Sequence, residues 1–111
     1  MLTFSDYQAR AMTTAVYPRR GEGNFTYPAL GLAGETGEVC EKLKKIIRDE
    51  AGVVTPERLS LLARELGDVL WYVAALATEL GLSLDDIAAG NLEKLAARKA
   101  AGRIHGSGDL R

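Results

Sequence analysis

Apolar side chains recur every three or four positions along most of this chain, which is the spacing that gives a helix one buried face. The pattern is clearest just before Gly81, where it is carried by Leu59, Leu62, Leu66, Val69, Leu70, Val73, Leu76 and Leu80. Together with the residues that start and stop helices, it predicts four helices, over residues 4–16, about 28–50, 56–80 and about 84–101.

Capping residues mark the ends of these segments. Thr3 can cap the first helix with its hydroxyl, and Pro18 ends it. Pro28 suits a first helical position, and Gly52 offers a left-handed terminator for the second helix. The stretch that begins at Ser83 matches a capping box, with Asp86 in place of the usual Glu.

The 111 residues amount to one compact domain. Ala and Leu together supply 32 residues and Val and Ile only 10, which favours helix over strand. We therefore expect an all-α, small four-helix bundle-like domain over residues 1–101, followed by a Gly-rich tail at 102–111. So short a chain leaves each helix little surface to bury, so a second subunit is expected to complete the core. A homo-oligomer, either a dimer or a dimer of dimers, is the prediction.

The charge and the rare residue types exclude several classes of function. A formal charge of -1 gives no overall basic field for nucleic acid or for an anionic membrane. No apolar stretch is long enough to span a bilayer, so a cytoplasmic protein is expected. Cys40, expected in the core, is the only cysteine and His105 the only histidine, which excludes disulfide frameworks and multi-histidine metal sites.

An internal repeat carries the acidic residues. Residues 32–39 (LAGETGEV) and 62–69 (LARELGDV) share a pattern of Leu-Ala-x-Glu-x-Gly-acid-Val. The acids lie three apart in each copy and so share one helical face, and the four are Glu35, Glu38, Glu65 and Asp68. If the two helices pack through their apolar stripes, four carboxylates converge, which is the oxygen-rich ligand set of Mg²⁺ or Mn²⁺.

A structural interpretation of these acids stays open. An isolated E-x-x-E commonly marks a solvated face, and Glu38 stands four residues before Lys42, in the order that supports an ion pair. Gly37 and Gly67 repeat at equivalent places although glycine disfavours helix, so we expect them to permit close packing.

The motif resembles that of the MazG-like, all-α nucleoside triphosphate pyrophosphohydrolases. Their E-x-x-E, variable spacer, E-x-x-D pattern matches residues 35–38 and 65–68, within the strings GLAGETGEV and ELGDVLWYVAALA, and the similarity extends through NLEKL at 91–95. Gly34 stands where relatives often carry a further Glu. The resemblance implies an enzyme that cleaves the α–β phosphoanhydride of a nucleotide and releases pyrophosphate, with a housecleaning role in the nucleotide pool.

The resemblance also suggests roles for individual residues. Metal would be held by the four motif acids, and Glu38 is the expected general base. Substrate phosphate or sugar would be contacted by Tyr72, Asn91 and Lys94. Arg98 is a further candidate because its spacing puts it on one face of the fourth helix with Asn91 and Lys94, although a cation there also suits a solvated helix end. The base would lie against aromatic rings, for which the candidates are Phe25, Tyr27 and Trp71, although large aromatics such as Trp71 equally serve in packing.

Two other functions remain compatible with the sequence. One is phosphoribosyl-ATP pyrophosphohydrolase, a similar small helical enzyme with related acidic motifs. The other is a non-catalytic helical module that binds a partner through its apolar stripes. A carboxylate-bridged di-iron bundle is disfavoured, because no predicted helix carries a histidine.

Overall fold

Four helices make up the computed structural model, which describes residues 1–102. In chain order they are α1 (Phe4–Met12), α2 (Thr26–Glu50), α3 (Pro56–Glu79) and α4 (Leu84–Ala100). The described residues contain no strand, which confirms the all-α prediction. The predicted tail at 102–111 lies outside the described residues except for its first residue.

The predicted caps form as the sequence requires. Thr3 and Asp6 make a reciprocal capping box at the start of α1, and the side chains of Thr55 and Ser83 cap α3 and α4. At the end of α2 the left-handed residues are Ala51 and Gly52, whose N–H groups both donate to the carbonyl of Ile46.

The first helix is shorter than predicted and ends at Met12 rather than near residue 16. The hydroxyls of Thr13 and Thr14 donate to the carbonyls of Arg10 and Ala11, three residues back, at 2.6 and 2.7 Å. These bonds satisfy the last carbonyls of α1 locally, so the chain can leave the helix early.

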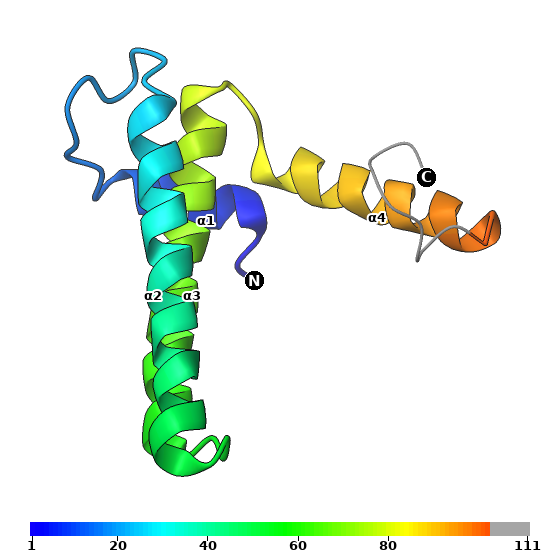
Figure 1. The fold of residues 1–111 in the computed structure, drawn as a ribbon. Coiled ribbons are helices and arrows are strands. Elements are labelled where there is room, and N and C mark those ends of the chain that lie inside the picture. Colours follow the sequence, from blue (N-terminus) through cyan, green and yellow to red (C-terminus); the bar gives the residue numbers. More distant parts are fainter. Residues whose placement is uncertain (103–111) are drawn as a thin grey trace.

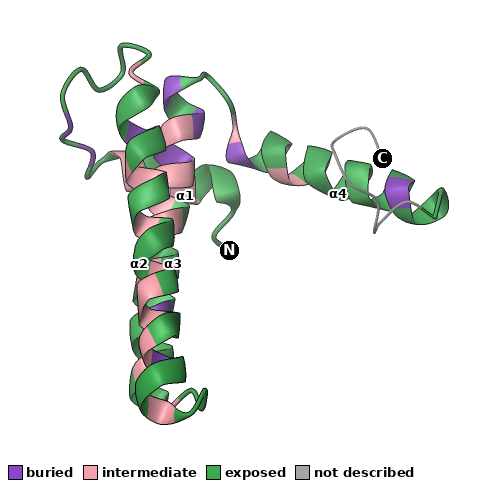
Figure 2. Cartoon of the chain, in the orientation of Figure 1, coloured by how far each residue is buried: buried purple, intermediate pink, exposed green. Residues whose placement is uncertain are grey.

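The helices α2 and α3 run side by side as a long antiparallel hairpin, with α1 packed across the end where α3 finishes (Figure 1). Buried residues gather at that end, where α1, the segment after it and α3 meet (Figure 2). Small side chains of α3, among them Ala74, Ala75 and Ala77, allow this close packing. Cys40 lies on the exposed side of α2, so the prediction that it belongs to the core is wrong.

The fourth helix projects away from the hairpin, and its start packs against α1 and, through Leu84, against Ala74 and Ala77 of α3 (Figure 1). The Gln8 side chain bonds the turn that precedes α4. Its amide nitrogen donates to Thr78 Oγ1 at 3.0 Å and to the carbonyl of Leu82 at 2.9 Å, and its oxygen accepts from the N–H of Leu84 at 2.9 Å. The turn between α3 and α4 is therefore tied to α1.

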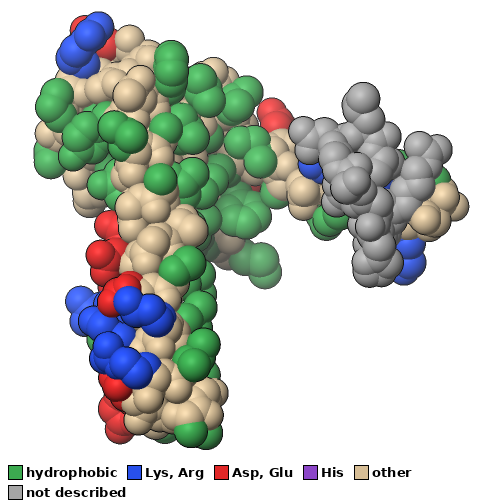
Figure 3. Space-filling model, viewed as in Figure 1, with side chains coloured by type: hydrophobic (Ala, Val, Ile, Leu, Met, Phe, Trp, Pro, Cys, Tyr) green, Lys and Arg blue, Asp and Glu red, His purple; other side chains and the backbone are tan. Residues whose placement is uncertain are grey.

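Large apolar side chains stay exposed on the hairpin and on α4, and in Figure 3 hydrophobic atoms cover the edge of the hairpin that faces α4. The exposed residues include Leu66, Leu70, Ile87, Leu92 and Leu95. Charged side chains gather instead on the lower part of α2, where Glu41 pairs with Lys44 and Lys45. Among residues 1–102, no helix combines the length and apolar character needed to cross a bilayer.

Candidate active site

The two acidic motifs face each other across the hairpin. Carboxylate oxygens of Glu35 on α2 and of Glu65 and Asp68 on α3 all lie within 4.8 Å of one another. The antiparallel packing of two helices with the same acidic repeat produces this arrangement, since each copy turns the same face toward the other. Three oxygen donors at this spacing match the hard ligand set of a divalent cation.

Glu38, the fourth acid of the motif, is exposed and is not one of this cluster of three, although its charge acts on Glu35. Lys42, which the sequence suggested as its ion-pair partner, instead contacts Glu65 of α3 at 3.2 Å. The cluster therefore has one cation beside it, while Glu38 keeps its carboxylate in solvent.

Crowding of like charges perturbs the cluster. Burial raises the pKa of Glu35, and the negative charges of Asp68, Glu65 and Glu38 raise it further. A bound cation would reverse this effect, because it favours the ionised carboxylate. The donor set and its electrostatics therefore both fit a metal ion.

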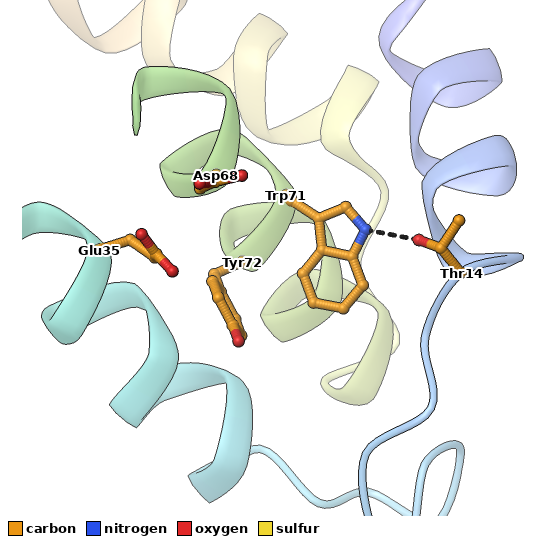
Figure 4. A pocket seen from close by; sticks show the side chains of 5 residues that line it. All are labelled: Thr14, Glu35, Asp68, Trp71 and Tyr72. Carbon is orange, nitrogen blue, oxygen red and sulfur yellow. Dashed lines mark hydrogen bonds between the residues drawn. The ribbon is translucent and has the colours of Figure 1, made fainter. Parts of the chain in front are cut away.

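A pocket of about 340 Å³ opens beside the acidic cluster and is lined by Thr14, Glu35, Asp68, Trp71 and Tyr72 (Figure 4). Carboxylates form one side and aromatic rings the other. A charged wall facing an apolar one suits a ligand with phosphates at one end and a flat ring at the other.

The indole of Trp71 is fixed by its polar edge. Its Nε1 donates to the carbonyl of Ala11 at 3.2 Å and to Thr14 Oγ1 at 3.0 Å. The ring meets Tyr72 edge to face, with centroids 5.0 Å apart. Because the N–H is already committed to α1 and the residues after it, Trp71 offers the pocket ring surface rather than a donor.

Gly31 lets the Tyr72 ring lie directly against α2. A β-carbon at Gly31 would stand 2.1 Å from Tyr72 Cε1, which no real contact allows. Burial raises the pKa of Tyr72, and the nearby Tyr27, Glu35 and Asp68 add to the effect. The hydroxyl therefore stays protonated at neutral pH and can act as a hydrogen-bond donor.

Gly31→Ala is expected to lower the melting temperature and to push Tyr72 out of the pocket. The clash outweighs the intrinsic preference of Ala for helix, which is about 1 kcal/mol. Gly34→Ala is the matched control on the same helix, because nothing lies within 4 Å of a β-carbon there, and it is expected to raise the melting temperature. Scanning calorimetry of the three proteins checks this, and equal stabilisation by both substitutions would contradict it.

Comparison with known proteins gives the family. Residues 26–102 match the model of the MazG nucleotide pyrophosphohydrolase domain. The chain belongs to the MazG nucleotide pyrophosphohydrolase family. It is 48% identical over 109 residues to the Gene 37 protein of Mycobacterium phage L5, a match that covers 95% of this chain and 96% of the relative. No solved structure matches it.

Nucleotide pyrophosphohydrolase activity is the general activity of a MazG domain. The matched region contains α2, α3 and α4, and thus both acidic motifs. In this chain, the pocket places Trp71 and Tyr72 beside Glu35 and Asp68.

Other predicted contacts are not brought together within the chain. Asn91, Lys94 and Arg98 lie on α4, which leads away from the hairpin (Figure 1), and Arg98 is buried there. Phe25 is 54% exposed and is not among the residues that line the pocket, and Tyr27 stacks on Tyr17 rather than lining it.

Gly37 and Gly67 do not serve close packing in the described chain, because a β-carbon at either position would meet nothing within 4 Å. The prediction for these glycines is wrong. Gly31 has that role, and the sequence marked it only as one more glycine in a helix. Thr14 was also missed, since a threonine near the end of a predicted helix carries no signal for a pocket wall shared with distant elements.

Proposed function

We propose that this protein is a nucleoside triphosphate pyrophosphohydrolase that depends on Mg²⁺, with Mn²⁺ as an alternative. It would release a nucleoside monophosphate and pyrophosphate, a reaction suited to clearing the nucleotide pool. The convergence of Glu35, Glu65 and Asp68 carries the proposal, because two of them, Glu35 and Asp68, line a pocket whose other side is aromatic. The acidic wall suits a cation with phosphates, and the aromatic wall suits a base or sugar.

Glu35, Glu65 and Asp68 would hold the metal, with Glu38 as the adjacent fourth carboxylate of the motif. When bound, a divalent ion neutralises the negative charge of the phosphates and polarises the bond to be broken. Lys42, paired with Glu65, would hold that carboxylate in position beside the metal.

Glu38 is the proposed general base. It lies outside the cluster of three and is exposed, so its carboxylate is free to accept a proton from water. As the water oxygen bonds to the α-phosphorus, the proton passes to Glu38 and the bond to the bridging oxygen breaks. Pyrophosphate leaves with that oxygen.

The pocket residues would bind the rest of the nucleotide. The protonated hydroxyl of Tyr72 is a donor for a phosphate oxygen, and the Trp71 ring offers a surface for the base. Phe25 and Tyr27 lie outside the lining and remain weaker candidates for the base.

A homo-oligomer, a dimer or a dimer of dimers, would complete both the core and the site. The exposed apolar side chains of the hairpin and α4, such as Leu66 and Leu92, support a second copy packed in the angle between them. In such an assembly Asn91 and Lys94 of one chain would serve the acidic cluster of its neighbour. Within one chain, α4 leads away from the acidic cluster, so these two residues could reach a cluster only in a neighbouring chain.

The deciding experiment measures pyrophosphate release from canonical and modified nucleoside triphosphates and from phosphoribosyl-ATP, with Mg²⁺, Mn²⁺ or EDTA. Metal-dependent release from triphosphates is expected from the native protein, with a loss of about 100-fold or more in Glu38→Gln. Glu41→Gln is the control on the same helix, because Glu41 pairs with lysines away from the pocket. Release from phosphoribosyl-ATP alone would reassign the substrate, and no release from any compound would favour a non-catalytic module.

A further inference from the structure

Glu79 is a buried carboxylate outside the acidic cluster. It is the last residue of α3 and is only 9% exposed. Its oxygens accept hydrogen bonds from the Tyr17 hydroxyl at 2.5 Å, from the N–H of Gly21 at 2.9 and 3.1 Å, and from the N–H of Asn24 at 3.0 Å. Every one of these donors belongs to the segment 17–25, the second part of the connection between α1 and α2. Glu79 therefore fastens this segment to the end of α3.

The backbone of this segment turns sharply between its bonded residues. Arg19, Gly21 and Gly23 have φ angles of 57°, 80° and 75°, in the left-handed region that glycine adopts readily and that costs a residue such as Arg19 about 1 kcal/mol. The bonds from Gly21 and Asn24, together with that from Tyr17, lower the pKa of Glu79, so the carboxylate stays ionised at neutral pH. An ionised acceptor makes stronger hydrogen bonds than a neutral one.

A continuous set of ring contacts leads from this anchor to the pocket. Tyr17, 8% exposed, stacks on Tyr27 with centroids 4.9 Å apart and meets Trp71 edge to face at 6.4 Å. Trp71 in turn meets Tyr72 at 5.0 Å, and both rings line the pocket. The hydroxyl that fixes Tyr17 is the one that donates to Glu79. A shift of Tyr17 would therefore remove the support behind the aromatic wall.

We propose that Glu79 is a positioning residue for substrate binding, which holds Tyr17 and the segment 17–25 in place and thereby fixes the Trp71–Tyr72 wall of the pocket. The inference rests on the proposed function for the identity of the substrate. The placement of the wall itself is independent of catalysis. Glu79 belongs neither to the acidic cluster nor to the pocket lining. Replacing its carboxylate should therefore weaken nucleotide binding and leave the rate of the chemical step unchanged.

Two variants test the proposal, with a readout that does not require activity. Glu79→Gln replaces the ionised acceptor at nearly constant size, and Tyr17→Phe removes only the hydroxyl and keeps the ring. Trp71 is the chain's one tryptophan, so quenching of its fluorescence by acrylamide reports on the wall directly. Glu50→Gln is the matched control, because Glu50 bonds Arg58 at the other end of the hairpin.

Quenching of Trp71 is expected to increase in Glu79→Gln and, less strongly, in Tyr17→Phe, under conditions where circular dichroism finds both folded. KM for the nucleotide is expected to rise about tenfold in Glu79→Gln, with kcat within about twofold of native. In Glu50→Gln, the quenching of Trp71 and the KM for the nucleotide are expected to equal the native values. Glu79→Asp, with its shorter ionised side chain, should recover part of the native KM.

Unchanged quenching and unchanged KM in Tyr17→Phe and Glu79→Gln would overturn the proposal. A fall in kcat at constant KM would also overturn it, because it would place Glu79 in the chemical step. If the native protein hydrolyses no nucleotide and quenching still rises in both variants, the proposed function fails while the anchoring of the wall stands.

Discussion

Asp68→Asn is expected to lower kcat/KM for nucleotide hydrolysis by about 1000-fold, the effect of losing several kcal/mol of stabilisation at a metal site. Asp68 supplies one of the three converging carboxylates and also lines the pocket. The amide keeps the shape of the side chain but loses the charge that a divalent ion requires. Hydrolysis measured across a Mg²⁺ titration checks this, and half-maximal activity should move to higher metal concentration.

The same substitution should stabilise the metal-free protein. The charge of Asp68 contributes to the raised pKa of Glu35, so removing it relieves repulsion in the folded state. If Asp68→Asn loses activity but melts at a higher temperature than the native protein in EDTA, the charge of Asp68 serves function and not stability. Glu57→Gln, at the exposed start of α3, is the control expected to retain activity. A variant that loses both activity and stability would argue that Asp68 serves the fold.

Mixed oligomers give the second large effect. If Lys94 of one chain serves the acidic cluster of another, Asp68→Asn and Lys94→Ala should each be nearly inactive alone, and refolding them together should restore activity. In a mixed dimer one site combines both damaged parts and the other combines both intact parts. Random pairing therefore yields about a quarter of the native activity.

The outcome depends on the direction of α4, which leads away from the hairpin of its own chain. If α4 served its own cluster instead, each site in a mixed dimer would carry one damaged part, and mixing would give only the average of the two variants. Light scattering on each protein supplies the control, since both substitutions should keep the native oligomer. A monomeric native protein with full activity would contradict the arrangement.

Local signals in the sequence predicted most of the helices. Thr3, Thr55 with Pro56, and Ser83 act on amides within three residues, so the starts of α1, α3 and α4 follow from short stretches of chain. The repeat also predicted that the acidic motifs would face each other. In both copies the acids hold the same position relative to the apolar stripe, so packing the two stripes together brings the acids to the same side. The structure brings together three of the four acids, Glu35, Glu65 and Asp68.

Long-range contacts could not be predicted in this way. The turn that precedes α4 is tied by Gln8 to residues 70 to 76 positions away, and a single glutamine in an amphipathic helix gives no sign of that. Glu79 looked like one more acid at a helix end, although its partners lie 55 to 62 positions earlier in the chain. Both cases involve polar side chains whose partners are fixed only when the tertiary fold is complete.

The hairpin places its tip, residues 51–55, at the opposite end from α1 and from the turn between α3 and α4 (Figure 1). The 26-residue spacer between the acidic motifs is this distal part of the hairpin. Lengthening both helices by about seven residues, close to two turns, would extend it while nearly preserving which faces meet. The distal hairpin is thus a region where chain length can change during evolution, or a reporter domain can be inserted, with the catalytic geometry untouched.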